Sequence, residues 1–153
     1  PKKEEVESYK EELIKEQKLS IKAASYINNY KILAFLRSPL AKRMREAQKE
    51  NMLYRERQFV VGIPAKELYE NCESEELIVL QGIIDAYFEE EEEIVLIDFK
   101  TDYVKDEEGE ELLRKRYQTQ FNCYKKALMQ MTGKNVKEMI LYSLSLEKEL
   151  YLE

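Results

Sequence analysis

The chain of 153 residues weighs 18.3 kDa and is 44% hydrophobic, which is enough for one domain around a single packed core. Its 31 acidic and 25 basic side chains give a net charge of −6, which excludes a grip on nucleic acid by bulk positive charge. Histidine is absent and cysteine occurs twice, which excludes a histidine base and a four-cysteine zinc or iron–sulfur site.

Targeting signals are missing from the sequence. No apolar run is long enough to cross a bilayer and no basic-plus-apolar leader opens the chain, so we expect no membrane partner. The chain begins at Pro1 rather than at a methionine, and we therefore expect it to be a piece of a longer polypeptide.

The first third of the chain predicts helices. A charged stretch with sparse apolar spacing indicates an exposed helix over residues 4–18, and Ser20 is a suitable N-cap for a second segment that ends near residue 27. A short apolar helix is expected over residues 30–36. Ser38-Pro39 signals another helix start, because proline at the first helical position loses no hydrogen bond. Residues 1–50 are thus expected to be helical.

The middle third predicts strands over residues 53–63, 77–88 and 94–100. The last two strands are joined by the acidic run 89–93 and should form an antiparallel hairpin. Five consecutive glutamates are poor turn residues, so we expect a loose, solvated loop rather than a tight two-residue turn.

The last third predicts a polar loop over residues 101–109 and a long helix over residues 110–132. Apolar positions recur along that helix in steps of three and four, and Gly133 follows it in the C′ position. Strands are expected over residues 137–146 and 150–152. The element order predicts an α/β fold with a central mixed sheet flanked by helices. Residues 53–153 would form the sheet-plus-helix core of a single domain that covers residues 1–153.

Two aspartates lie inside strands that otherwise read as buried. Carboxylates are rare at such positions unless they are paired or bound to metal. If the hairpin is centred near residues 91–92, Asp85 and Asp98 lie on neighbouring strands at about the same height. On a shared face their β-carbons would be roughly 5 Å apart. Gly82, three residues before Asp85, suits the close approach of a ligand or another backbone.

Lys100 lies two residues beyond Asp98 and therefore on the same face of its strand. Two close carboxylates repel each other, so either one pKa rises or a cation lies between them. Mg²⁺ suits such a site because it takes oxygen ligands and keeps several waters. A neighbouring ammonium group can orient a water or stabilise charge on a phosphoryl group.

Two acids, one lysine and no histidine favour metal-assisted phosphodiester cleavage over acyl transfer and glycoside hydrolysis. The plainer alternative is an Asp-x-Lys surface pair without catalytic function.

The long helix carries two polar groups on or beside its apolar stripe. Gln120 would need a partner there, such as the Asp98–Lys100 strand end, a metal-bound water or a substrate phosphate. The alternative is a glutamine at the helix edge that points to solvent. Tyr124 is equally compatible with a core position that keeps its hydroxyl at the rim.

Three motifs, taken in this order and spacing, resemble the RecB-type nucleases of the PD-(D/E)xK superfamily. They are GIID at residues 82–85, IDFKTD at 97–102 and YQTQFNCY at 117–124. The similarity extends from about residue 27 to the end of the chain. It is greatest to the C-terminal nuclease domain of the AddA-type helicase–exonuclease subunit of bacterial recombination complexes. It also includes Ser38-Pro39-Leu40, Tyr54-Arg55-Glu56 and Thr132-Gly133-Lys134.

This resemblance implies a restriction-endonuclease-like core and a specific set of catalytic residues. Asp85 and Asp98 would be metal ligands, with the backbone carbonyl of Phe99 as a further ligand. Lys100 would be the catalytic lysine beside the two aspartates.

The resemblance also implies supporting residues. Gln120 and Tyr124 fall in the family's Q-x-x-x-Y motif, near the active site and DNA. Glu56 matches an acidic position on the preceding strand, with support and catalysis both open. The sequence departs from the family in one respect, since the family's metal-binding histidine on an early helix has no counterpart. Either the piece starts downstream of that helix or its site lacks that ligand, and the isolated piece would then be weakly active or inactive.

The implied function is a Mg²⁺-dependent deoxyribonuclease, the exonuclease of an ATP-dependent helicase–exonuclease that acts in double-strand break repair and recombination. Mn²⁺ is expected to substitute for Mg²⁺, and no iron–sulfur cluster is expected. Its partners would be DNA, the helicase portion of the same chain and a second helicase–nuclease subunit, in the bacterial cytoplasm. The alternative is a non-catalytic module that keeps the nuclease fold for DNA guidance or for contact with another subunit.

Charge is unevenly distributed along the chain. The acidic run 89–93 lies about six residues, roughly 20 Å, from Asp98, so it can point away from DNA. Basic side chains on the predicted helices offer a local basic rim, although most are expected to be solvated helix faces. They are Lys42, Arg43, Arg45, Arg114, Lys115, Arg116, Lys125 and Lys126.

Overall fold

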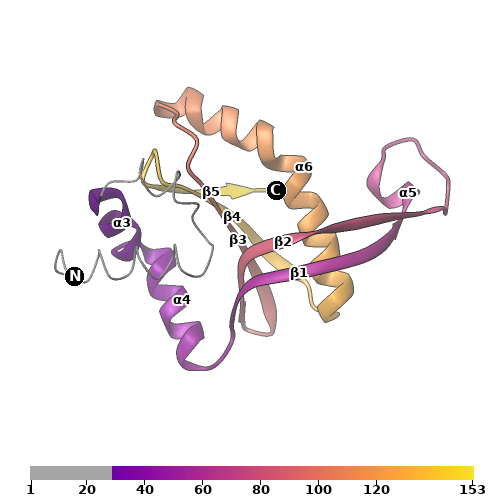
Figure 1. Ribbon diagram of the computed structural model, residues 1–153, viewed down its shortest axis with the longest axis horizontal. Coiled ribbons are helices and arrows are strands. Elements are labelled where there is room, and N and C mark those ends of the chain that lie inside the picture. The colour runs from indigo at the N-terminus through magenta and orange to yellow at the C-terminus, as the bar shows by residue number, and fades with distance from the viewer. Residues whose placement is uncertain (1–28) are drawn as a thin grey trace.

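A five-stranded sheet in the order β1-β2-β3-β4-β5 forms the centre of the computed structural model, which describes residues 29–153 (Figure 1). Neighbouring strands are antiparallel except for β3 and β4, which are parallel. The strands are β1 (Leu53–Pro64), β2 (Leu77–Glu90), β3 (Glu93–Lys100), β4 (Val136–Ser143) and β5 (Lys148–Leu152). The predicted mixed sheet flanked by helices is confirmed.

Helices cover both faces of the sheet (Figure 1). The long helix α6 (Asp106–Thr132) packs on one face, where Phe121 and Leu128 are fully buried. Helices α3 (Asn29–Leu36) and α4 (Pro39–Lys49) pack on the other, where Leu40 is fully buried. Among the helices of residues 29–153, none combines the length and apolarity that a membrane span requires.

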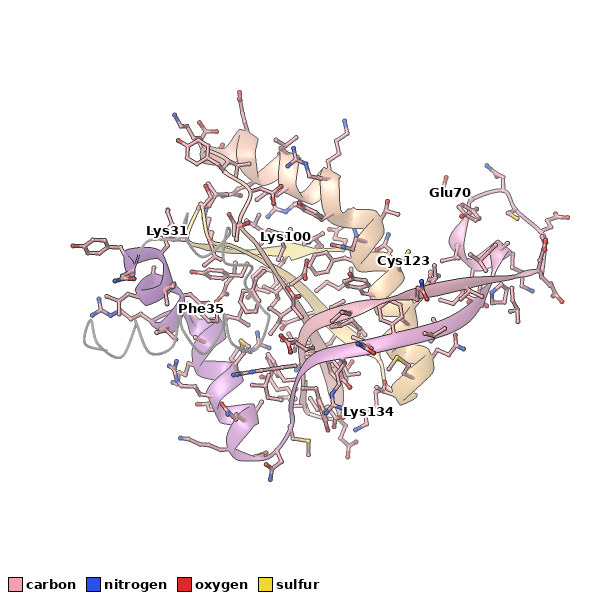
Figure 2. All side chains as sticks on the ribbon, viewed as in Figure 1. Lys31, Phe35, Glu70, Lys100, Cys123 and Lys134 are labelled. Carbon is pink, nitrogen blue, oxygen red and sulfur yellow. The ribbon has the colours of Figure 1, made fainter. Side chains whose placement is uncertain are left out.

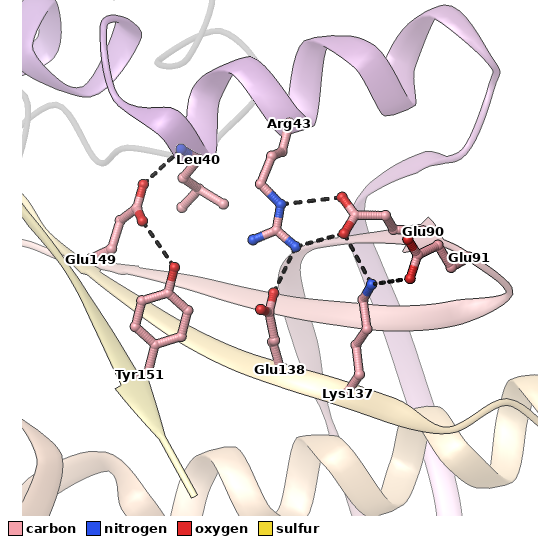
Figure 3. Close-up of polar contacts among 8 residues, drawn as sticks. All are labelled: Leu40, Arg43, Glu90, Glu91, Lys137, Glu138, Glu149 and Tyr151. Atoms are coloured by element: carbon pink, nitrogen blue, oxygen red, sulfur yellow. Dashed lines mark hydrogen bonds and ion pairs between the residues drawn. The ribbon is translucent and has the colours of Figure 1, made fainter.

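The start of α4 follows the local signals in the sequence. Pro39 occupies the first helical turn, and the Ser38 hydroxyl accepts a hydrogen bond of 3.1 Å from the Ala41 N–H. The Glu149 carboxylate reaches this helix end from β5 and accepts a 2.6 Å hydrogen bond from the Leu40 N–H (Figure 3). The helices predicted over residues 4–18 and 20–27 lie outside the described residues.

The long helix begins earlier than predicted, at Asp106. Gly109, which the sequence assigns to a loop, lies inside the first turns, and a Cβ there would come within 2.8 Å of Val104. Three acidic residues in the first turn suit the helix dipole, which the loop assignment did not take into account. A one-turn helix α5 (Ala65–Leu68), which the sequence pattern did not predict, lies between β1 and β2.

The β2–β3 hairpin has the predicted register, with Ala86 opposite Ile97 and Glu90 opposite Glu93. The prediction of a loose loop was wrong. Glu91 and Glu92 form a two-residue turn with φ of 55° and 66°, the left-handed conformation that suits the twist of a hairpin.

Ion pairs around the turn explain why glutamates are tolerated there. Arg43 of α4 contacts Glu90 at 2.9 Å and Glu138 at 2.7 Å, and Lys137 contacts Glu90 at 3.0 Å (Figure 3). Lys134 contacts Glu89 at 2.6 Å. These tertiary contacts neutralise the carboxylates next to the turn.

We expect Glu90→Gln to lower the free energy of unfolding at pH 7 by about 1 kcal/mol, a modest value because the Glu90 side chain is 35% exposed and solvent screens the pair. The Arg43 hydrogen bond, assisted by Lys137, lowers the pKa of Glu90 from 4.5 to about 2. The stabilisation is therefore fully present above pH 4.5 and is lost as the pH falls through 2.

Urea unfolding of both proteins at pH 7 and near pH 2 checks this expectation. Glu92→Gln, in the same turn but without an ion pair in the described part of the chain, is the matched control. If the unfolding free energies of the wild type and Glu90→Gln differed as much near pH 2 as at pH 7, this expectation would be contradicted.

The β1–β2 ribbon changes direction beside the core. Ile84 packs toward α6, whereas Ala86, two residues on, packs toward α4, so the normal alternation of faces breaks at Asp85. The facing position on β1 is Glu56, which has a φ of 49° and falls between the pairs Arg55–Ala86 and Arg57–Ile84. Beyond this break the ribbon packs on α6, where Phe59, Val61 and Ile63 of β1 are buried, and it carries α5 at its tip (Figure 1).

Candidate active site

Three elements bring the predicted site residues to one place. Asp85 lies at the break in β2, Asp98 and Lys100 lie at the end of β3, and Gln120 lies on the face of α6 that meets this end of the sheet. Figure 2 labels Lys100 between the sheet and α6.

Asp98 and Lys100 form a largely buried ion pair. Asp98 is 4% exposed, and its Oδ2 lies 2.6 Å from the Lys100 Nζ. Burial raises the pKa of Asp98 to about 8, and the hydrogen bond and negative charge of Asp85 add to the rise, while Lys100 opposes it. The site thus places Asp85 next to a buried acid, Asp98, whose charged form is unfavourable.

Where β2 and β3 separate, the Asp85 side chain replaces the backbone hydrogen-bond partner that β3 would otherwise find on β2. The paired register ends at Ala86–Ile97, and the Asp85 Oδ2 then accepts a 3.0 Å hydrogen bond from the Phe99 N–H. The Lys100 carbonyl accepts from the Leu144 N–H at 3.0 Å, beyond the end of β4. Because backbone groups alternate sides along a strand, the Phe99 carbonyl lies on the opposite side, toward Asp85.

Gln120 and Tyr117 of α6 contact the Lys100 side chain. Its Nζ donates a 3.0 Å hydrogen bond to the Gln120 Oε1 and lies 4.2 Å from the centroid of the Tyr117 ring. The Gln120 Nε2 in turn donates to the Tyr124 hydroxyl at 3.2 Å. Gln120 therefore points to the strand end that carries Lys100 rather than to solvent.

The Tyr117 ring is fixed by a second polar group that sequence reasoning did not assign. Its hydroxyl lies 2.8 and 2.9 Å from the two Asp102 oxygens, and Arg116 contacts Asp102 at 2.5 Å. The signal was present in the sequence, since Asp102 follows Lys100 by two residues and Tyr117 precedes Gln120 by three. The partnership of Asp102 with Tyr117 depends on the tertiary fold.

Gly82 makes room for an aromatic ring rather than for a ligand or backbone. A Cβ at Gly82 would lie 3.1 Å from the Phe59 ring and 3.6 Å from the Tyr124 ring. Phe59 meets Tyr124 edge to face, with centroids 5.5 Å apart. Phe59 and Gly82 thus fix the position of the tyrosine that bonds Gln120.

Glu56 is the predicted residue that the structure does not bring into the cluster. Its side chain is exposed, and within residues 29–153 it has no hydrogen bond or ion pair with Asp85, Asp98 or Lys100. Its positive φ turns the backbone at the position that faces Asp85.

The donor set suits a hard divalent cation that keeps part of its water shell. Within the described residues, the buried Asp98 Oδ2 makes no hydrogen bond of acceptable geometry, although Lys100 is close. No group of three or more acidic or cysteine side chains converges in that part of the chain. The available donors are therefore two carboxylates and the Phe99 carbonyl, a small oxygen set of the kind that Mg²⁺ accepts together with waters.

Comparison with known proteins gives consistent matches. The profile of the PD-(D/E)XK nuclease superfamily matches residues 1–151. An ATP-dependent helicase/nuclease subunit of Clostridium botulinum (strain 657 / Type Ba4) is 41% identical over 155 residues, which cover 99% of this chain and 12% of that protein. The protein of the same name from Clostridium perfringens (strain ATCC 13124) is 43% identical over 143 residues, 90% of this chain and 11% of its own length. The chain thus spans about an eighth of the length of these relatives.

Proposed function

The chain belongs to the PD-(D/E)XK nuclease superfamily, and on this premise we propose that it is a metal-dependent DNA nuclease domain with Asp85, Asp98 and Lys100 as its catalytic set. The observation that carries the proposal is the buried Asp98 between Asp85 and a lysine that contacts α6. A buried acid whose charged form is unfavourable next to a second carboxylate has little structural value, whereas a cation would relieve it.

The proposal gives each residue a role at a phosphodiester bond. Asp85, Asp98 and the Phe99 carbonyl hold Mg²⁺, with Mn²⁺ able to substitute. When bound, the cation supplies Lewis-acid polarisation of the phosphate and an acidified water. Lys100 donates hydrogen bonds to the attacking water or to a non-bridging phosphate oxygen, where negative charge develops.

Gln120 and Tyr117 act on Lys100 in this scheme. The Gln120 amide accepts one of the three ammonium protons, which directs the remaining two toward Asp98 and the substrate. The Tyr117 ring stabilises the ammonium charge from one side. Both contacts orient the Lys100 ammonium group without placing another negative charge next to the substrate.

We also propose that the domain belongs to a larger helicase–nuclease. By analogy with the relatives, whose names describe subunits of an ATP-dependent helicase/nuclease, the domain would work in a longer chain with a helicase portion and beside a second subunit. It would act on DNA during double-strand break repair and recombination in the bacterial cytoplasm. Weak intrinsic affinity for DNA, expected from the net charge of −6, suits a nuclease to which a linked motor feeds a strand.

The proposed function predicts cleavage of DNA that depends on a divalent cation. We expect the chain to degrade linear DNA in millimolar Mg²⁺ or Mn²⁺ and to leave it intact in EDTA. Gel analysis of end-labelled DNA gives the measurement, and a longer chain that continues upstream is assayed if the 153-residue chain is inactive. Equal cleavage in Mg²⁺ and in EDTA would contradict metal dependence, and inactivity of both chains would favour a non-catalytic module.

A further inference from the structure

Asp102 lies in the loop that joins β3 to α6, two residues beyond Lys100. Its carboxylate reaches α6, where the Tyr117 hydroxyl lies 2.8 and 2.9 Å from its two oxygens and Arg116 lies 2.5 Å from its Oδ2. This side chain therefore ties the loop to the helix next to the lysine of the proposed catalytic set. The roles given above to Asp85, Asp98 and Lys100 at the phosphodiester bond make no use of it.

The Tyr117 hydroxyl donates its hydrogen bond to Asp102. Burial raises the pKa of Asp102, but hydrogen bonds from Tyr117, from Arg116 and from its own backbone N–H together hold the pKa of this carboxyl below its ordinary value. Burial, and then the hydrogen bond to Asp102, raises the pKa of Tyr117. An ionised carboxylate only accepts hydrogen bonds, and a protonated phenol has one to donate. The ring is therefore fixed by a charge-assisted hydrogen bond, which is the stronger kind.

The same ring contacts Lys100. The Lys100 Nζ lies over the Tyr117 ring, 4.2 Å from its centroid. Tyr117 precedes Gln120 by three residues, so both side chains lie on one face of α6, and Gln120 Oε1 accepts a 3.0 Å hydrogen bond from the same ammonium group. Asp98 contacts this group at 2.6 Å from β3. The position of the ammonium group thus depends on a ring that Asp102 anchors.

The loop that carries Asp102 is fixed on both sides. Before it, the Lys100 carbonyl accepts a 3.0 Å hydrogen bond from the Leu144 N–H. After it, the Ser145 hydroxyl accepts from the Val104 N–H at 3.1 Å and donates to the Val104 carbonyl at 3.0 Å. These bonds tie the loop to the connection between β4 and β5. The Asp102 carboxylate therefore meets α6 from a restrained backbone.

An ammonium group on a lysine keeps one direction only when its neighbours restrain it, because the four-carbon stem is flexible. Small displacements of a reacting group lower the rate strongly, and neighbouring packing and hydrogen bonds prevent them. We propose that Asp102 is a positioning residue of the cleavage reaction, which keeps the Tyr117 ring against Lys100 and thereby directs the ammonium group to the phosphate. This inference rests on the proposed function for the role of Lys100.

A set of variants separates this positioning role from an ion pair that only stabilises the fold. Asp102→Leu removes the acceptor, Tyr117→Phe removes the hydroxyl but keeps the ring, and the double variant removes both ends of the hydrogen bond. Asp102→Asn keeps an acceptor oxygen for Tyr117. Glu111→Leu, at an exposed position of α6, is the matched control for the loss of one negative charge. Thermal melts verify folding, and Tyr117→Phe serves alone if Asp102→Leu does not fold.

We expect Asp102→Leu and Tyr117→Phe each to lower kcat for Mg²⁺-dependent DNA cleavage about tenfold, a loss typical of groups that orient a reactive residue, with little change in KM. The double variant should lose no more than either single variant, because both changes break the same hydrogen bond. Asp102→Asn should retain most of kcat, and Glu111→Leu should cleave like the wild type. Equal losses in Asp102→Leu and Glu111→Leu, or additive losses in the double variant, would overturn the inference.

A second readout needs neither metal nor DNA. Protons that lie over an aromatic ring resonate upfield of their ordinary position, so the Tyr117 ring should shift the ε-methylene protons of Lys100 upfield in NMR spectra recorded in EDTA. The signal is identified by its absence from Lys100→Met. We expect the upfield shift to shrink in Asp102→Leu and in Tyr117→Phe and to persist in Glu111→Leu. An unchanged shift in Asp102→Leu would mean that Asp102 does not position the ring.

Lys100→Met separates this inference from the proposed function, in the 153-residue chain or in the longer chain if only that one cleaves DNA. If Lys100→Met is inactive while Asp102→Leu keeps the kcat of the wild type, the inference fails and the proposed function stands. If Lys100→Met cleaves like the wild type, the catalytic role of Lys100 fails and the inference fails with it.

Discussion

Lys100→Met is expected to lower Mg²⁺-dependent DNA cleavage by at least about 100-fold, the usual loss when one donor that stabilises transition-state charge is removed. Methionine keeps an unbranched apolar stem against the Tyr117 ring, so packing next to the ring should be retained. The variant loses the contacts to Asp98 at 2.6 Å and to Gln120 at 3.0 Å, and with them the only proposed cationic donor at the phosphate. Initial rates on end-labelled linear DNA at saturating Mg²⁺ give the measurement.

The control for this variant is Lys115→Met on the exposed side of α6. Lys115 is exposed and has no ion pair in the described residues, so its replacement tests the loss of one positive charge without touching the cluster. We expect cleavage close to that of the wild type. Wild-type rates in Lys100→Met, with a wild-type melting temperature, would remove Lys100 from the catalytic set.

Asp98→Asn is expected to abolish the stabilisation of the protein by Mn²⁺. A cation at about 100 times its Kd adds about 2.7 kcal/mol to the stability of the state that binds it, which raises the Tm of a domain of this size by about 5–10 °C. Asparagine retains the shape of the side chain but presents at most a neutral oxygen to the cation, so the Tm of the variant should not respond. Differential scanning fluorimetry with a Mn²⁺ titration measures the effect.

The metal-free form of this variant provides an internal check. Burial and the neighbouring Asp85 already disfavour the charged form of Asp98, so a neutral amide should leave the Tm without metal close to that of the wild type. Asp106→Asn, an exposed position at the start of α6, is the matched control and should keep the full response to Mn²⁺. An undiminished Mn²⁺ response in Asp98→Asn would place the cation elsewhere.

The parts of the cluster that depend on strand periodicity were predictable. A hairpin centred at residues 91–92 brings Asp85 and Asp98 to the same height, and the observed register has that centre. The period of two along β3 then places Lys100 on the side of Asp98, and their side chains are 2.6 Å apart. The catalytic roles of these residues stay predictions, but their proximity required only local rules.

The tight turn at residues 91–92 and the reversal of faces at Asp85 could not be predicted from local rules alone. Glu91 and Glu92 adopt a tight turn because Arg43, Lys134 and Lys137, all distant in sequence, neutralise the carboxylates next to it. The reversal of faces at Asp85 and the positive φ of Glu56 arise where the ribbon leaves one packing surface for another. Neither position carries a glycine or proline that would have indicated the break.

The sequence by itself determined most of the elements, the hairpin register and the two acids with a lysine beside them, because helix caps, apolar spacing and strand period act over a few residues. The tertiary structure alone decided that Gln120 bonds Lys100, that Phe59 fills the space above Gly82, that Glu56 faces solvent and that Asp102 bonds Tyr117. Each of these features joins residues from separate elements, and packing of α6 on the sheet, rather than any local preference, sets the distances between them.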